Sequence, residues 1–168
     1  AQQVQNLFAG KAEEVAQPYE FINRPLDVKF LLDELERLSQ TDIMYRGRLN
    51  TQQVGVIGQS FGAYTALALA GANINFNSLK KDCANVNSSW DLSLLLQCRA
   101  LVLPNYNYDL QDSRVKAVIA INLIGSSVFG KDGLNNINIP VTIIAGTADT
   151  IAPALLEQIM PFTWLNNP

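Results

Sequence analysis

The chain has 168 residues, of which 48% are hydrophobic and only 16% are charged, and this composition suits a single globular core over residues 1–168. The formal net charge of -3, without any run of Lys or Arg, argues against nucleic acid or an anionic membrane surface as a partner. The apolar stretches are too short to span a bilayer, so no transmembrane segment is expected. The N-terminus lacks the pattern of a secretory signal, and the missing initiator Met suggests an excised piece.

The first element along the chain is a predicted helix that begins at Arg24-Pro25 and ends near Gln40. Pro at the first helical position and Asp27 in the first turn are typical of a helix start. Apolar side chains recur at helical spacing and predict the buried stripe, which consists of Val28, Leu31, Leu32, Leu35 and Leu38.

A buried strand and a second helix are predicted next. Residues 54–57 are apolar and mostly β-branched, and they lead directly into Gly58. Residues 63–70 are rich in Ala, which favours a helix that can lie close to a sheet, and Gly71 offers a left-handed end to it.

Residues 73–112 form a polar, irregular stretch that we interpret as an excursion above the sheet, with enough Leu between 92 and 103 for one short helix. The stretch holds Cys83 and Cys98, which are either buried thiols or a disulfide. A disulfide here would contribute about 3 kcal/mol in the chain-entropy model and would indicate an extracytoplasmic location; free thiols would indicate a cytoplasmic one.

Two further buried strands are predicted at 115–121 and 140–145, with a loop at 133–138 between them and a short helix at 153–160. Strands that are apolar throughout are typical of a parallel sheet covered by helices on both faces. The predicted fold class is therefore α/β.

The segment Gly58-Gln59-Ser60-Phe61-Gly62 matches the Gly-x-Ser-x-Gly nucleophile elbow of serine hydrolases, and it lies between a predicted strand and a predicted helix, as that motif requires. Side chains at Gly58 and Gly62 would collide with the neighbouring strand or helix, and the serine takes a strained backbone conformation. Ser60 is thus the candidate nucleophile. The backbone N–H of Phe61, at the start of the helix, is the candidate oxyanion donor.

Asp149 is the candidate acid of a catalytic triad because it follows the strand that ends at Ala145, at the same edge of the sheet as Ser60. A turn or helix N-cap aspartate is the alternative interpretation. Asn122, which follows the other late strand, cannot serve as the acid. The chain contains no His, the usual general base for a serine nucleophile. With no His and two cysteines, no metal site is expected, and no cofactor is implied.

The sequence resembles the predicted dienelactone hydrolases and platelet-activating-factor acetylhydrolase-like α/β-hydrolases, including bacterial lipase-like members, in four segments: Arg24 to Val28, Val54 to Ala72, Arg114 to Ile121 and Pro140 to Pro153. Related elbows usually carry His in place of Gln59, and many carry Gly in place of Ala63. The resemblance implies a carboxylic ester hydrolase with Ser60 as nucleophile and Asp149 as acid. It also implies that the catalytic His and the second oxyanion donor lie outside this chain, which is truncated at both ends.

The favoured function is therefore a serine esterase or lipase that acts on a small-molecule or lipid-like ester through an acyl-enzyme and is nearly inactive as this chain alone. A hydrophobic substrate group would contact Phe61, Leu123, Ile124, Val128 and Phe129, unless these residues are ordinary core. The alternatives are a non-catalytic α/β-hydrolase-fold binding or assembly module, and a chain whose base comes from a partner subunit. Open sheet edges would allow a homo-oligomer.

Overall fold

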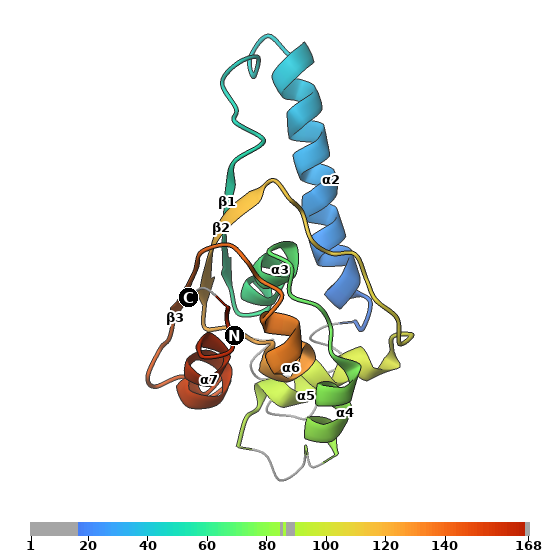
Figure 1. Ribbon diagram of the computed structural model, residues 1–168, viewed down its shortest axis with the longest axis vertical. Coiled ribbons are helices and arrows are strands. Elements are labelled where there is room, and N and C mark those ends of the chain that lie inside the picture. Colours follow the sequence, from blue (N-terminus) through green and yellow to red (C-terminus); the bar gives the residue numbers. More distant parts are fainter. Residues whose placement is uncertain (1–16, 85, 87–89, 167–168) are drawn as a thin grey trace.

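The computed structural model describes residues 17–84, 86 and 90–166, and its centre is a three-stranded parallel sheet in the order β1-β2-β3 (Figure 1). The strands are β1 (Val54–Gln59), β2 (Val115–Ile121) and β3 (Val141–Ile144). Gln59 pairs with Ile121, and Ile121 pairs with Ile144, so the three strands end level with one another. The predicted α/β class and the parallel sheet are both confirmed.

Helices flank this sheet, and most of them lie on one side of it in Figure 1. Helix α3 packs on β1 and β2, α2 packs on α3, and α4 packs on α6. None of the helices in the described part of the chain is long and apolar enough to cross a membrane. The helices are α2 (Glu20–Thr41), α3 (Phe61–Leu69), α4 (Phe76–Cys83), α5 (Ser93–Gln97), the 3-10 helix η3 (Cys98–Val102), α6 (Ser126–Leu134), the π-helix η4 (Ala154–Ile159) and α7 (Met160–Phe162).

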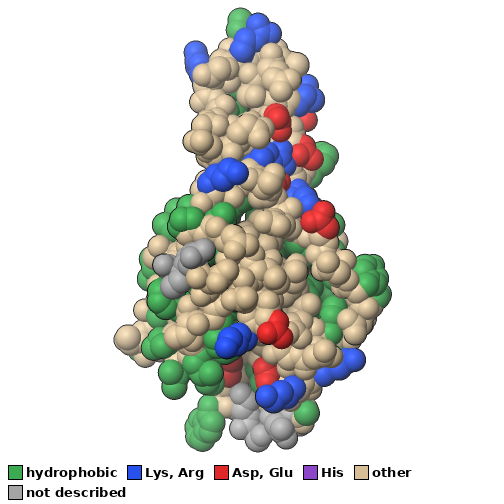
Figure 2. All heavy atoms as spheres, viewed as in Figure 1, with side chains coloured by type: hydrophobic (Ala, Val, Ile, Leu, Met, Phe, Trp, Pro, Cys, Tyr) green, Lys and Arg blue, Asp and Glu red, His purple; other side chains and the backbone are tan. Residues whose placement is uncertain are grey.

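The sheet is covered on one face by described residues, so the expectation of two covered faces is wrong for this part of the chain. Burial alternates along β1, with Val54 and Val56 half-buried beneath α3. On the opposite face Ile57 is 70% exposed and Ile144 is 46% exposed. Figure 2 shows hydrophobic side chains along the flank of the molecule on which β3 and α7 lie. The open face therefore carries apolar side chains as well as polar ones.

Helix α2 begins at Glu20 and continues through Pro25, so the prediction that the helix begins at Arg24-Pro25 is wrong. Proline cannot donate a hydrogen bond to the carbonyl four residues earlier, which here belongs to Phe21. The hydroxyl of Tyr64, on α3, donates to that carbonyl at 2.9 Å. Because this tertiary bond satisfies the freed carbonyl, the helix does not have to end at the proline.

Arg114, just before β2, fastens α2 to the sheet. Its guanidinium lies 2.7 Å from a carboxylate oxygen of Asp33 and 3.1 Å from one of Glu36, both on α2. A third carboxylate, that of Asp112, lies 2.6 Å away and accepts further hydrogen bonds from Arg114. These bonds lower the pKa of Asp112 despite the opposing effect of its burial. The ion pairs thus link α2 to the segment that leads into β2.

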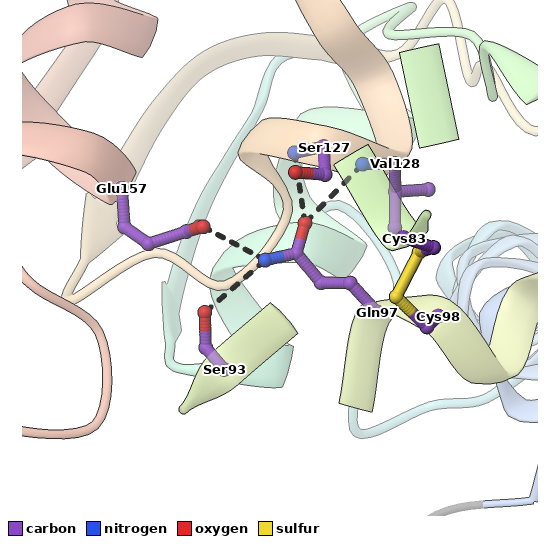
Figure 3. Close-up of a disulfide and its surroundings, with 7 residues drawn as sticks. All are labelled: Cys83, Ser93, Gln97, Cys98, Ser127, Val128 and Glu157. Carbon is purple, nitrogen blue, oxygen red and sulfur yellow. Dashed lines mark hydrogen bonds between the residues drawn. A yellow bond between two sulfur atoms is a disulfide. The ribbon is translucent and has the colours of Figure 1, made fainter. Parts of the chain in front are cut away.

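The polar excursion folds into α4, α5 and η3, and a disulfide between Cys83 and Cys98 joins the end of α4 to the start of η3. The two Cα atoms are 5.7 Å apart, within the usual range for a disulfide. The sequence left open whether these two residues are buried thiols or a disulfide, and the structure contains the disulfide. Gln97, the residue before Cys98, accepts a hydrogen bond from the N–H of Ser127 at the start of α6 (Figure 3).

Candidate active site

Ser60 lies in the sharp turn between β1 and α3, at the level where the three strands end. Its backbone has φ 55° and ψ -122°, a combination outside the main allowed regions for a residue with a side chain. The turn is held on both sides: the Ser60 N–H donates to the carbonyl of Ile121 at 2.9 Å, and the Ser60 carbonyl accepts from the N–H of Ala63 at 2.9 Å. The neighbouring strand and the following helix thus maintain the strained conformation.

The two glycines of the motif differ in what their surroundings demand. A Cβ on Gly58 would collide with the carbonyl of Gly62 and would lie 2.7 Å from the backbone nitrogen of Ala63. A Cβ on Gly62 would meet nothing within 4 Å. The predicted steric requirement therefore holds at Gly58, where the backbone of Gly62 leaves no room for a side chain, and is wrong at Gly62. Gln59, the last residue of β1, is exposed.

Phe61 has its backbone N–H at the start of α3 and its side chain in the core. As the first residue of α3, its N–H belongs to the group that a helix leaves without an internal acceptor. Its ring is buried, with the ring of Phe21 at 4.7 Å and that of Tyr64 at 5.4 Å between centroids. The guanidinium of Arg24 lies 4.6 Å from the ring centroid. The side chain therefore anchors the turn, and the N–H at the start of α3 stays the candidate oxyanion donor.

Asp149 lies on the loop after β3, with both carboxylate oxygens bonded. One oxygen accepts from the N–H groups of Ile151 at 2.8 Å and Ala152 at 3.0 Å, and the other accepts from the side-chain amide of Asn122. Burial would raise the pKa of Asp149, but the two backbone N–H groups and the amide outweigh it, and the net pKa is lowered. The bonds from Ile151 and Ala152, two and three positions after Asp149, are the bonds expected of a turn aspartate, which was the alternative interpretation of this residue. A carboxylate has about four acceptor positions, so this carboxylate can also accept from a base.

Asn122 is a residue of the candidate site that the sequence does not predict, because an amide side chain cannot serve as the acid of a triad. It follows β2 directly and has φ 45°, a left-handed conformation that Asn tolerates better than most residues. Its amide donates to Asp149, and its side-chain oxygen accepts from the N–H of Gly146 at 3.1 Å. Asn122 thus orients the loop that carries the candidate acid, Asp149. An Asn immediately after a buried strand was the available signal.

Ser60 and Asp149 stand on either side of the end of β2. Neighbouring strands lie about 4.8 Å apart, so the ends of β1 and β3 are separated by about 10 Å across the intervening strand. The arrangement places a serine hydroxyl, an N–H at a helix start and an ionised carboxylate where the parallel strands end. A group that accepts a proton from Ser60 and contacts Asp149 would have to lie between them, and the chain has no His to supply it.

The apolar residues considered for substrate contact belong to the core. The most exposed of them retains 7% of its accessible surface, and all five pack in the single cluster beneath the sheet edge: Phe61, Leu123, Ile124, Val128 and Phe129. The ring of Phe129 stacks on that of Tyr64 at 4.8 Å. These residues are therefore ordinary core residues and not an exposed surface for a hydrophobic substrate group.

A buried polar network lies below this edge and holds the start of α6 (Figure 3). One carboxylate oxygen of Glu157 accepts from the N–H groups of Gly125 at 2.9 Å and Ser126 at 3.1 Å. The amide oxygen of Gln97 accepts from the N–H groups of Ser127 at 2.8 Å and Val128 at 3.2 Å. The N–H groups that a helix start leaves without internal acceptors are thus satisfied by side chains from η4 and α5.

The same network fixes the loop between β2 and α6. The side-chain amide of Gln158 accepts from the N–H of Leu123 at 2.8 Å and donates to its carbonyl at 3.0 Å. Glu157 also accepts from the side-chain amide of Gln97 at 2.7 Å and from the hydroxyl of Ser126. Because Leu123 follows Asn122, the network supports the residue that orients Asp149.

A second carboxylate, Asp91, lies beside this network and lines a cavity of about 660 Å³. Burial raises the pKa of Asp91 to about 8, with repulsion from Glu157 and a hydrogen bond to Glu157 acting in the same direction. The hydroxyl and N–H of Ser93 donate to Asp91 and partly oppose the shift. The fold therefore favours the protonated form of Asp91.

The raised pKa of Asp91 predicts a pH-dependent stability. The pKa of Asp91 is near 3.8 in the unfolded chain and about 8 in the folded one. The contribution of this difference to the free energy of unfolding is fully present below about pH 4 and is lost as the pH rises toward 8. The loss is at most about 1.4 kcal/mol per pH unit. Urea unfolding of the parent and of Asp91→Asn between about pH 5 and pH 9 should show the parent falling relative to the variant up to about pH 8. If the free energies of unfolding of the parent and of Asp91→Asn differ by a constant amount across this range, the pKa of Asp91 is not raised.

No family model, curated protein or solved structure matches this chain.

Proposed function

We propose that this chain carries the nucleophile and the acid of a serine hydrolase with an α/β-hydrolase fold, which acts on carboxylic esters through an acyl-enzyme. Ser60 is the nucleophile, Asp149 is the acid and the N–H of Phe61 is one donor to the oxyanion. The general base comes from a segment or subunit outside this chain. By this proposal the chain alone hydrolyses esters slowly or not at all.

The observation that carries the proposal is the backbone conformation of Ser60 at the turn from a buried strand to a helix. A strained residue costs of the order of 1–3 kcal/mol and persists where the surrounding structure enforces it, which occurs most often at functional sites. Here Ile121 and Ala63 enforce it through backbone bonds, and Gly58 leaves the space for it. This enforced strain supports a chemical role for the serine at the turn.

The proposed reaction has two steps. The base takes the proton from the Ser60 hydroxyl as its oxygen bonds to the ester carbonyl carbon, and the negative charge that develops on the carbonyl oxygen is stabilised by the N–H of Phe61. The carbon–oxygen bond to the alcohol then breaks, and the alcohol takes the proton back from the base. Water attacks the resulting acyl-serine in the same way, releasing the acid. Asp149 orients the base and stabilises its charged form.

The test of this proposal replaces the missing base with free imidazole. The chain is incubated with a fluorophosphonate, which phosphonylates an activated serine and releases fluoride, and the adduct is located by peptide mass spectrometry. We expect labelling of Ser60 that increases with imidazole concentration and is absent in Ser60→Ala. The exposed serine variant Ser113→Ala should label as the parent does. Asp149→Asn should reduce the labelling rate about tenfold, because the imidazole is then less well oriented.

Two results would contradict the proposal. An absence of Ser60 labelling at every imidazole concentration would favour the non-catalytic binding or assembly module. Rapid turnover of a p-nitrophenyl ester without imidazole, lost in Ser60→Ala, would show that a base is already present in this chain.

The disulfide between Cys83 and Cys98 supports, as part of this proposal, an extracytoplasmic location, because disulfides persist in oxidising compartments. A small-molecule or lipid-like ester is the proposed substrate. Pairing of two copies through the open sheet edges is the proposed route to any homo-oligomer.

A further inference from the structure

Two adjoining cavities lie away from Ser60, where the end of α3 and the start of α4 meet the segment before β2. Their volumes are about 340 Å³ and about 360 Å³. Both are lined by Asn73, Asn107 and Asn136, so they form one continuous surface feature, which we call the asparagine groove. The first cavity is lined by three further asparagines, Asn75, Asn77 and Asn105.

The asparagine groove is built from three chain segments that are fastened to one another by their backbones. The N–H of Asn73 donates to the carbonyl of Gly133 at 3.3 Å, and the N–H of Asp112 donates to the carbonyl of Leu69 at 3.0 Å. A Cβ on Gly133 would collide with the carbonyl of Asn73, so the two segments are in direct backbone contact. The walls of the groove are thus fixed by the fold.

The lining of the groove is polar but nearly uncharged. Within the described part of the chain, the side-chain amides of Asn73, Asn105 and Asn107 make no hydrogen bond, which leaves both their donors and their acceptors available. The first cavity contains one charged side chain, Asp132, and the second contains one, Asp109. Neither cavity is lined by Lys or Arg, so an anionic group would find no opposite charge there.

An aromatic surface adjoins these amides. Tyr106 lines the first cavity and is 60% exposed, so its ring is accessible to a ligand in that cavity. Its ring centroid lies 4.4 Å from that of Tyr108, which lines the second cavity. The hydroxyl of Tyr108 donates to the carbonyl of Pro104 at 2.9 Å, and this bond holds the pair in place.

We propose that the asparagine groove binds a neutral carbohydrate. Each sugar hydroxyl is both a donor and an acceptor, and an Asn amide offers both partners on one flat group. The C–H face of a sugar ring is apolar and packs on an exposed aromatic ring such as Tyr106. The cavity volumes fall within the range of small-ligand sites, about 300–1,000 Å³. The groove is independent of the proposed ester hydrolysis at Ser60.

The test is titration of the isotope-labelled full chain with neutral oligosaccharides, namely maltotriose, cellotriose, xylotriose and triacetylchitotriose, monitored by NMR of the backbone and the Asn side-chain amides. We expect at least one of the four to produce saturable shifts, with a Kd in the range of about 0.1–10 mM, that centre on Asn105, Tyr106 and Asn107. The double variant Asn105→Ala/Asn107→Ala and the single variant Tyr106→Ala should each weaken binding by about tenfold or more.

Matched controls are available at the far end of the molecule. Asn50→Ala and Tyr45→Ala remove the same side-chain types from the loop between α2 and β1, and they should leave the Kd unchanged. The proposal is overturned if none of the four sugars produces saturable shifts. It is equally overturned if the groove variants, shown to be folded by circular dichroism, bind as the parent does, or if glycerol reproduces the shifts at the same concentration.

Discussion

Replacing Glu157 by Ala is expected to lower the free energy of unfolding by about 3–5 kcal/mol. Glu157 is completely buried and accepts from two backbone N–H groups, the Ser126 hydroxyl and the Gln97 amide. Alanine would leave these donors in the interior without acceptors, and each buried unsatisfied donor costs about 1–3 kcal/mol before relaxation. Urea unfolding followed by circular dichroism measures the effect.

Two variants separate this effect from the loss of charge or of side-chain volume. Glu157→Gln keeps the shape of the side chain but turns an amide NH₂ toward donors. We therefore expect its free energy of unfolding to lie between that of the parent and that of the Ala variant. Glu34→Ala removes an exposed glutamate that pairs with Arg37, and it should change stability little because exposed ion pairs contribute little. A Glu157→Ala protein as stable as Glu34→Ala would show that α6 does not depend on this cap.

Replacing Gly58 by Ala is expected to disrupt the elbow and to lower the free energy of unfolding by about 3 kcal/mol or more. The added methyl group would overlap the carbonyl of Gly62, and this atom belongs to the backbone of α3, so it cannot turn aside as a side chain would. Either β1 and α3 move apart or Ser60 leaves its strained conformation. Thermal unfolding measures the first consequence, and loss of imidazole-dependent labelling at Ser60 measures the second.

Gly62→Ala is the matched control, because a methyl group there meets nothing within 4 Å and lies in α3. Alanine favours a helix over glycine by about 1 kcal/mol, so this variant should be as stable as the parent or slightly more stable. Equal destabilisation by both substitutions would mean that the close contact between Gly58 and Gly62 is not what requires glycine.

The strands and α3 were predictable because their determinants are local. A short apolar, β-branched run is a strand signal by itself, and the strand predicted at 115–121 matches β2 residue for residue. The Ala-rich segment after Ser60 likewise indicates α3 without help from distant residues. The turn between them could be recognised because its motif lies on consecutive residues.

Helix α6 was not predicted, and a loop was expected where it ends, because its determinants lie elsewhere in the chain. Its sequence contains Gly130 and Gly133, and its N–H groups are satisfied by Gln97 and Glu157, about 30 residues away on either side. Gly130 has φ 58°, and a Cβ there would lie 2.6 Å from the Ser78 hydroxyl oxygen, so this glycine is required by α4 packing. No local pattern contains this information.

The candidate site divides in the same way. Ser60 and Asp149 each follow a predicted strand, so the topology of a parallel sheet was enough to place them at one edge. Asn122 belongs to the candidate site only because the fold brings it beside the loop after β3. Its backbone is left-handed, and its side chain makes two hydrogen bonds to that loop. The start of α2 was misplaced for the same reason, since the hydroxyl that satisfies the Phe21 carbonyl comes from Tyr64.

The parallel pairing of the strands also determines when the site can form during folding. Val54 pairs with Val115, and Gln97 bonds to Glu157 across 60 positions of sequence. Such contacts close long loops before they gain any stabilisation, which slows folding compared with a protein held by local contacts. Ser60 in particular depends on the carbonyl of Ile121, the last residue of β2. The strained turn therefore becomes stable only when β2 has docked beside β1.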